Sequence, residues 1–465
     1  MKKIITLLLV LATSTSSVFA QQPVEFKLSC SEPYAVYDFI TKISDNYPDN
    51  ELKSIFSNSK YNTEAFKKQI ADFEQLPIDY TYAFTQYPSP LKTGLMSRDM
   101  LERNLAISQT IADFRNKSLG LIPNEYLSVF SETLENFLPI YQELVFEPNK
   151  TAFEVQKNNL QNYIKNNQFS NFFQTGLTFY NTNWDKNIPF ELNLLPSLDK
   201  GNLGARAFIN VAVCEAPLDL KDHVSFFSVA MHEIYHIVYD NQSLQMKENI
   251  QKWFNETKSP NSQYALLLMN EVLATALGNG YVIEQINKKA DDGEWYANKY
   301  VSEMAKAIYP VLKKYIEDKK PMDEAFVKAY VNTYDTQFPQ WNNELSHLFA
   351  YRYIVADTPS DWTYFRRNFR KYSNNRMGAP VSATEVEKTM AMPITKVVVI
   401  SQNHEQKLNL LKDYFDVLKN KKLNPKAEFI EIFNLPDNTK LFIINRHKST
   451  VEDMMNKRFP NKLIK

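Results

Sequence analysis

The chain has 465 residues with 53 basic and 53 acidic side chains, so its formal net charge is zero. This balance gives no electrostatic reason to expect binding to nucleic acid or to an anionic membrane surface. Hydrophobic residues make up 44% of the chain and only 9 glycines occur, which predicts a mainly helical protein of the α+β class with a large core.

The N-terminus has the pattern of a secretory signal peptide over residues 1–20. Lys2 and Lys3 precede an apolar run, and a segment of small residues ends at Ala20. We therefore expect cleavage near Ala20 and export to the periplasm or the medium. In such an oxidising compartment, Cys30 and Cys214 either form one disulfide or remain two buried thiols.

Residues 21–169 are predicted to form a helical N-terminal region with breaks at several prolines. No catalytic group of residues is visible in it. We expect this region to form one wall of a cleft. Two alternatives stay open, namely a removable pro-segment that closes the site and an interaction domain that lies away from it.

Two strands are predicted next, over residues 190–195 and 205–213, separated by a turn-rich segment. They begin a domain that we place at 170–371, in which a small sheet precedes a long helix at 224–239. The strand around 208–213 either borders a cleft and pairs with an extended peptide, or is internal without substrate contact.

An HExxH motif, His232-Glu233-Ile234-Tyr235-His236, lies in the segment 224–239, which has no Gly or Pro and is apolar on every face. Such a segment is typical of a buried helix. Residues four apart share one face of a helix, so both imidazoles point to one place, where they can bind zinc. Glu233 lies a quarter turn away and can activate a water molecule there. The alternative is a pair of inert histidines.

A third metal ligand is expected, because catalytic zinc sites usually have three protein ligands and one open position. Glu271 is the only charged residue of the apolar run 263–283. A buried carboxylate is costly unless a cation or strong donors compensate it, and a metal ion is such a cation. Pairing with an Arg or Lys elsewhere is the alternative. A membrane span is not expected, because Asn270 and Glu271 lie at the middle of the run.

These two segments resemble the gluzincin metallopeptidases, the thermolysin-like and neprilysin-like group. The resemblance covers the HExxH motif, the N-E-x-x-A pattern from Asn270 to Ala274, and the separation between the two. It implies zinc as the cofactor, with His232, His236 and Glu271 as its ligands and Glu233 as the general base.

The chain departs from these families at Thr275, where an Asp that orients the first His usually follows the small residue. Asp240, one helical turn beyond His236, matches an Asp of the thermolysin group and is a candidate for an orienting or structural role.

The resemblance also implies a His, Tyr or Arg, well downstream of the third ligand, that polarises the scissile carbonyl. His347 is the best match. It lies on a predicted helix at 341–356, with Tyr351 one turn further on and Arg352 next to it. The alternative is a core or capping histidine.

The last part of the chain is predicted to be a linker at 372–395 and a small α/β module at 396–465. Its strands are expected at 396–401, 427–433 and 440–445, alternating with helices.

Taken together, these patterns predict an exported, zinc-dependent peptidase with a zincin-like catalytic domain and a peptide or protein as its substrate. Glu233 is expected to take a proton from the attacking water and pass it to the leaving amine. Two alternatives remain open, which are an inactive peptide-binding or scaffolding protein with a relic site and a zinc hydrolase of a non-peptide substrate.

Overall fold

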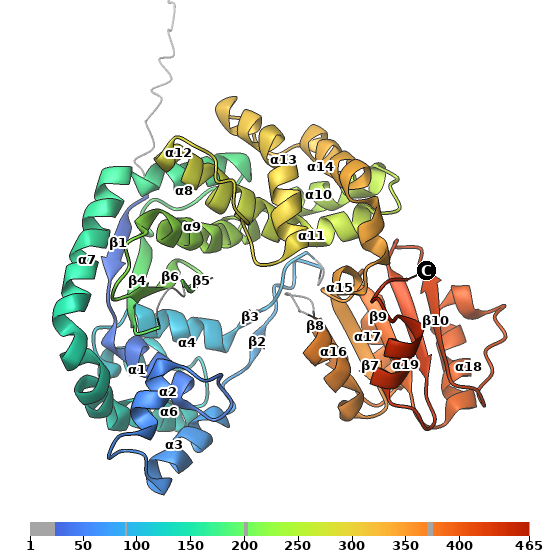
Figure 1. Cartoon of the computed structure of the whole chain (residues 1–465), viewed down its shortest axis with the longest axis horizontal. Helices are drawn as coiled ribbons and strands as arrows, with labels where there is room; N and C mark the ends of the chain where they lie inside the picture. Colours follow the sequence, from blue (N-terminus) through green and yellow to red (C-terminus); the bar gives the residue numbers. More distant parts are fainter. Residues whose placement is uncertain (1–23, 89–90, 200–202, 370–374, 465) are drawn as a thin grey trace, which may run out of the picture.

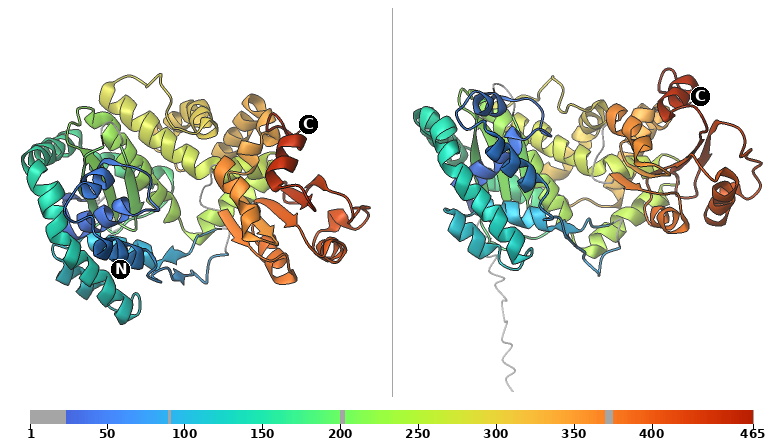
Figure 2. Two further views of the ribbon diagram at one scale, coloured as in Figure 1. Left: turned by 60° about the horizontal axis from the view of Figure 1, so that its bottom comes forward. Right: turned by 90° about the horizontal axis from the view of Figure 1, so that it is seen from below.

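The computed structural model describes residues 24–88, 91–199, 203–369 and 375–464. Within these residues the chain is mostly helical and contains three small sheets, which confirms the predicted mainly helical α+β class. The predicted signal peptide and its cleavage site near Ala20 lie outside the described residues. Figure 2 shows the N-terminal helices at one end of the molecule and the C-terminal part at the other.

The N-terminal part begins with a strand and continues mainly in helices. Its elements are β1 (Phe26–Ser29), α1 (Glu32–Ile43), α2 (Glu51–Ser57), α3 (Glu64–Glu74), β2 (Thr81–Tyr82), β3 (Leu95–Met96), α4 (Ser97–Ala106), α5 (Ile111–Lys117), α6 (Asn124–Tyr141), η1 (Gln142–Phe146), α7 (Glu147–Asn167) and α8 (Phe169–Phe179). Strands β2 and β3 form an antiparallel hairpin that reaches from these helices toward the C-terminal part (Figure 1). We call its described residues, 81–88 and 91–96, the arm.

The first sheet has the strand order β1-β4-β6-β5, with β4 at Phe190–Ser197, β5 at Ala205–Phe208 and β6 at Val211–Pro217. Strand β1, which no sequence pattern predicts, pairs with β4 in parallel. The prediction of one strand over 205–213 is wrong, because a turn at Ile209 and Asn210 divides it into the hairpin β5–β6. Ile209 has a φ of 59°, which a β-branched residue seldom adopts, and no Gly or Pro marks this turn.

Two hydrophobic cores lie on opposite faces of this sheet. Val211 and Val213 of β6 pack with the helices α1 to α6, whereas Ala212 and Cys214 pack with α7, α8 and α9. This alternation is the ordinary period of a strand. The N-terminal helices are therefore built onto the same sheet that supports α9.

Both cysteines are thiols in the structure. Ser29, before Cys30, pairs with Asn193 of β4, and Leu194 of β4 pairs with Cys214 of β6. The two cysteines are thus about two strand spacings apart, roughly 9.6 Å, which is too far for a disulfide without backbone movement.

The middle of the chain is helical after the sheet. Its elements are α9 (His223–Asp240), α10 (Leu244–Glu256), α11 (Ser262–Thr275), η2 (Ala276–Val282), α12 (Ile283–Asn287), α13 (Lys299–Glu317), α14 (Glu324–Gln337), η3 (Pro339–Asn343) and α15 (Leu345–Leu348). Elements α11, η2 and α12 form one continuous helix, of which η2 is a π-helical segment. This helix is apolar and long enough to span a membrane, but 67% of its most apolar window is buried against the rest of the protein.

The C-terminal part is built on a second sheet with the order β10-β11-β9-β7-β8. Its elements are β7 (Arg352–Ala356), η4 (Pro359–Trp362), α16 (Thr363–Asn368), β8 (Asn375–Gly378), α17 (Ala383–Met390), β9 (Thr395–Ile400), α18 (His404–Tyr414), η5 (Asp416–Leu418), β10 (Phe429–Asn434), β11 (Lys440–Asn445) and α19 (Val451–Arg458). All neighbouring strands run parallel except β10 and β11.

One expectation for this part differs from the structure. The predicted helix over 341–356 is wrong, because α15 is short and the chain then forms β7, a strand whose five residues are all buried. A strand that is buried on both faces has no alternating pattern, so its sequence resembles that of a buried helix. The described part of the predicted linker at 372–395 contains β8 and α17.

Candidate metal centre

Helix α9 carries the HExxH motif in the interior of the protein. Asp222 caps the helix, accepting a hydrogen bond from the backbone N–H of Ser225 at 3.0 Å. Apolar residues surround the helix, and most of them are fully buried. His232 is buried, whereas Glu233 and His236 are half-buried. The motif therefore lies where a core helix meets a solvent-accessible space.

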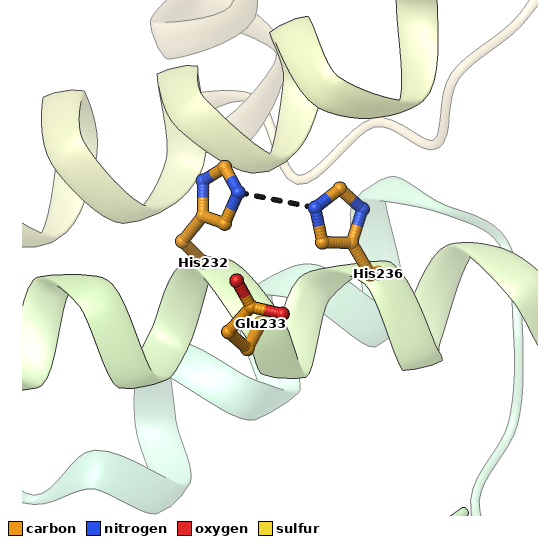
Figure 3. Close-up of side chains that lie close together, drawn as sticks. All are labelled: His232, Glu233 and His236. Carbon is orange, nitrogen blue, oxygen red and sulfur yellow. Dashed lines mark hydrogen bonds between the residues drawn. The ribbon is translucent and has the colours of Figure 1, made fainter. Parts of the chain in front are cut away.

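The side chains of the motif form a compact group. The Nε2 atoms of His232 and His236 lie 3.0 Å apart, and the carboxyl group of Glu233 lies beside them (Figure 3). Each of the three side chains has a potential ligand atom, an imidazole nitrogen or a carboxylate oxygen, and these three atoms lie within 4.8 Å of one another. This group fits the HExxH motif and could hold a metal ion.

Glu271 approaches the same place from α11. Its Oε2 atom lies 3.7 Å from Nε2 of His232 and 3.6 Å from Nε2 of His236. This oxygen is buried, and no described residue makes a hydrogen bond to it. Burying a carboxylate oxygen without a donor is costly, so the arrangement suits a cation between the carboxylate and the two imidazoles.

The electrostatics of this group also favour a positive charge. Burial disfavours the charged form of His236, yet the adjacent Glu271 carboxylate raises the pKa of His236 to about 9. Burial likewise opposes ionisation of Glu271, but the two imidazoles hold the pKa of Glu271 well below its usual range. A set of groups that stabilises an extra proton in this way can stabilise a metal cation for the same reason.

Two side chains of the helix that bears Glu271 orient the imidazoles. Asn270 Oδ1 lies 3.0 Å from Nδ1 of His236, and Thr275 Oγ1 lies 3.5 Å from Nδ1 of His232. Partners at Nδ1 fix each ring and leave both Nε2 atoms directed at the common centre. Thr275, where the resembling families usually have an Asp, therefore contacts the first histidine of the motif through its hydroxyl.

Gly278 of η2 brings the second helix into contact with α9. A Cβ atom at this position would lie 2.9 Å from the backbone N and Cα atoms of His232, closer than packed atoms approach. A larger residue would push the helices apart. The glycine therefore sets the spacing between the helix that bears Glu271 and the helix that bears the histidines.

A cavity of about 400 Å³ opens onto this group. Its wall includes Glu233, His236 and Glu271 together with residues from distant segments of the chain. These are Leu91 and Thr93 of the arm, Lys247, Ile250 and Gln251 of α10, Tyr296, and Tyr351, Met392, Pro393 and Ile394 from the C-terminal part. The N-terminal arm and the C-terminal part thus both contribute to the space in front of the candidate metal centre.

His347 is not among the residues that line this cavity. It is buried beside the rings of Tyr300 and Trp341 and is hydrogen-bonded to the hydroxyl of Tyr334 at 2.7 Å. Burial lowers the pKa of His347 to about 3. The structure therefore does not bring His347 together with Glu233. Tyr351, which the sequence placed near it, does line the cavity.

Three residues near the centre carry no recognisable sequence signal. The ring of Tyr296 is stacked on His232, with centroids 5.4 Å apart. Lys92 of the arm and Lys247 of α10 both pair with Asp240, at 2.8 Å and 3.5 Å. Within the described part of the chain, Asp240 thus pairs with lysines and makes no hydrogen bond to an imidazole. Such residues come from separate segments, so no local pattern could have identified them.

No family model matches the chain, and comparison with curated proteins and with solved structures finds no match. The residues themselves therefore carry the functional assignment. They show a His232-Glu233-His236 group on α9 that fits an HExxH motif and could hold a metal ion, with His232 buried and the other two side chains half-buried.

Proposed function

We propose that this protein is an exported, zinc-dependent peptidase of the gluzincin type. The observation that carries the proposal is the convergence of His232, His236 and Glu271 beside Glu233, at a place where three of these four residues, Glu233, His236 and Glu271, line one cavity. His232, His236 and Glu271 would hold the metal ion, and Glu233 would act as the general base. The histidines lie on one helix and Glu271 on another that is separate in the sequence. An HExxH motif that occurred by chance would not bring a carboxylate from a second helix to the same place.

The distances between the three donor atoms suit zinc. In a tetrahedral site with zinc–ligand bonds of about 2.0–2.1 Å, the ligand atoms lie roughly 3.3–3.4 Å from one another. The three observed distances, 3.0, 3.6 and 3.7 Å, lie on both sides of this value. Two imidazoles and one carboxylate would supply three ligands, the number that catalytic zinc sites usually take from the protein.

When bound, zinc would supply a Lewis acid that lowers the pKa of a water molecule and polarises a carbonyl group. Glu233 lines the cavity, and there it would take a proton from the attacking water and deliver it to the leaving amine. Tyr296 and Tyr351 line the same cavity, so we assign the donor to the scissile carbonyl to one of these phenols in place of His347.

Short or flexible peptides are the proposed substrates. The cavity of about 400 Å³ is near the lower end of ligand-site volumes. The arm contributes to one side of it and the C-terminal part to another, which limits access by a folded protein. The signal-peptide pattern supports action outside the cytoplasm, and the neutral charge balance gives nucleic acid no advantage as a partner.

The metal requirement is tested by metal analysis of purified protein after supplementation with zinc. We expect about one zinc per chain in the wild-type protein, because sites with three protein ligands normally retain the ion. Glu271→Ala should lose most of the zinc, whereas Glu248→Gln, an exposed acid on α10, should keep it. Less than about 0.2 zinc per chain in the wild-type protein would contradict the proposal.

The activity is tested by digesting a broad peptide library with and without a chelator. Glu233→Gln should keep the metal and lose nearly all turnover, which a relic binding site would not show. Cleavage that persists unchanged in the chelator would exclude the metal mechanism. A zinc-loaded protein that cleaves no peptide would favour the binding protein or the non-peptide hydrolase.

A further inference from the structure

Two lysines share one carboxylate at the end of the metal-site helix. Lys92 Nζ lies 2.8 Å from Oδ2 of Asp240 and 3.1 Å from its backbone oxygen, and Lys247 Nζ lies 3.5 Å from Oδ1. The side chains of Lys92 and Lys247 are only 12% and 6% exposed, whereas that of Asp240 is 53% exposed. Two largely buried positive charges are therefore balanced by a single, half-exposed negative charge.

Lys247 retains capacity to donate hydrogen bonds. An ammonium group has three N–H donors. Among the described residues, its one hydrogen-bond acceptor is Asp240, at the long distance of 3.5 Å, and the ammonium also lies over the ring of Tyr239. Burial lowers the pKa of Lys247, with Lys92 acting in the same direction and Asp240 opposing it. A further negative charge next to Lys247 would be stabilised by this environment.

Lys247 faces the cavity that contains the candidate metal centre. Lys247, Ile250 and Gln251 lie three and four residues apart on one face of α10, and all three line the cavity. The ammonium of Lys247 and the amide of Gln251 thus offer donors on one wall, next to an apolar surface. This combination of a charge, an amide and an apolar patch is suited to a carboxylate attached to a small organic chain.

The interval between Lys247 and the candidate metal centre is comparable to the length of two or three extended peptide residues. Asp240 is one helical turn, roughly 6 Å along the axis of α9, beyond His236. The Nζ atom of Lys247 lies 3.5 Å from the carboxylate of Asp240. An extended peptide advances about 3.3 Å per residue, so two or three residues cover the interval. A carboxylate held by Lys247 would place a peptide bond near Glu233 and the metal ligands.

We propose that Lys247 binds a carboxylate of the substrate and thereby selects peptides that are anionic two or three residues from the bond that is cut. This inference rests on the proposed peptidase function and adds a substrate class to it. The carboxylate comes either from the C-terminus of a short peptide or from an Asp or Glu side chain. The first source predicts a preference for a free C-terminal acid, and the second predicts a preference for an internal acidic residue.

The test compares matched synthetic pentapeptide pools on the zinc-loaded wild-type protein. One pair of pools differs only in a free C-terminal acid or a C-terminal amide, and a second pair differs only in Asp and Glu or Asn and Gln at internal positions. We expect kcat/KM to be at least about tenfold higher for the anionic member of one pair, since a hydrogen bond to a charged group contributes that much. The pair that responds identifies the source of the carboxylate.

Variants at Lys247 separate substrate binding from a structural role. Lys247→Met keeps most of the length of the side chain but removes its charge. It should abolish the difference in kcat/KM between the anionic and neutral members of the pair, mainly through a higher KM for the anionic peptides. Lys247→Arg should retain part of the preference. The matched control is Lys252→Met, an exposed lysine on the same helix, which should change nothing.

Two results would overturn the inference while the peptidase function stands. One is chelator-sensitive cleavage with no preference within either pair of pools, a comparison that needs only the wild-type protein and holds even if Lys247→Met does not fold. The other is an equal loss for anionic and neutral peptides in Lys247→Met. Absence of chelator-sensitive cleavage from every pool would instead overturn the proposed function, and this inference with it.

Discussion

Asn270 and His236 are joined by a contact of 3.0 Å between Oδ1 and Nδ1, although they lie on different helices. Asn270 directly precedes Glu271, so one turn of α11 both presents a carboxylate to the centre and orients an imidazole of α9. The helix pair is thus held in register by the residues that form the site.

The first prediction concerns this contact. Asn270→Ala removes the partner that orients the ring of His236, and we expect zinc affinity to fall by about 10- to 100-fold. Competition with a chelating dye measures the change. Asn255→Ala, at an exposed position of α10, is the matched control and should leave the affinity unaltered. Unchanged affinity in Asn270→Ala would show that packing alone orients the ring.

The second prediction concerns His347 and pH. A chain of hydrogen bonds fixes the proton on His347. The side-chain amide of Asn261 donates to Asp335, that of Asn342 donates to Asn261, and the hydroxyl of Tyr334 donates to Asn342. Because this hydroxyl has already used its only hydrogen, it accepts a hydrogen bond from Nε2–H of His347. Nδ1 of His347 is buried, with no hydrogen-bond partner among the described residues. Protonation there would place an unpaired charge in an aromatic environment, which agrees with a pKa lowered from 6.5 to about 3.

Because the folded state holds His347 neutral, its contribution to stability is fully present above pH 6.5 and is lost as the pH falls toward 3. The free energy of unfolding should lose about 1.4 kcal/mol per pH unit from this group between those limits. His347→Gln should flatten the dependence in urea unfolding at a series of pH values, and should keep turnover within about twofold. Loss of turnover in a folded, zinc-loaded His347→Gln protein would restore His347 as a candidate catalytic residue.

The third prediction concerns the contact between η2 and α9. Gly278→Ala places a Cβ atom 2.9 Å from the backbone of His232, so we expect a loss of roughly 1–3 kcal/mol in the free energy of unfolding. Zinc affinity should fall as well, because the helix that bears Glu271 moves away from the histidines. Gly293→Ala, at an exposed loop position, is the control. A stable Gly278→Ala protein with normal zinc affinity would mean that the helices tolerate a wider spacing.

The fourth prediction concerns the arm. Tyr82 and Leu95 are paired across the hairpin, so residues 83–94 can be replaced by an Asn-Gly turn between them. This change removes Leu91 and Thr93 from the cavity wall and should allow longer peptides to be cut, as measured by the lengths of the peptides consumed from a mixed digest. Lys92→Met keeps the arm but removes its ion pair with Asp240, and serves as the comparison. An identical length limit in the shortened protein would show that the arm is not a wall of the cleft.

Local patterns in the sequence were sufficient to locate the central elements. The HExxH helix follows from its apolar faces and the four-residue spacing of its histidines, and Glu271 stands out because it is a lone charge in an apolar run. The structure brings these side chains to within 3.7 Å of one another. Their roles as metal ligands stay a prediction.

Long-range contacts could not be read in the same way. Strand β1 is short and pairs with β4, and β7 has the composition of a buried helix, so neither has a local signature. Tyr296 stacks on His232, and Lys92 and Lys247 pair with Asp240, although the three residues belong to different segments of the chain. Their positions depend on tertiary packing, which no window of neighbouring residues contains.

The pairing of Phe26 with Phe190 has a consequence for how the protein acquires its structure. The first described strand cannot find its partner until about 160 further residues have been synthesised, and contacts of such sequence separation form late and slowly. The sheet that supports α9 is therefore completed only when most of the chain is present. A chain that is threaded through a membrane from its N-terminus would cross before its fold is complete. The helices of the candidate metal centre would then pack together on the far side.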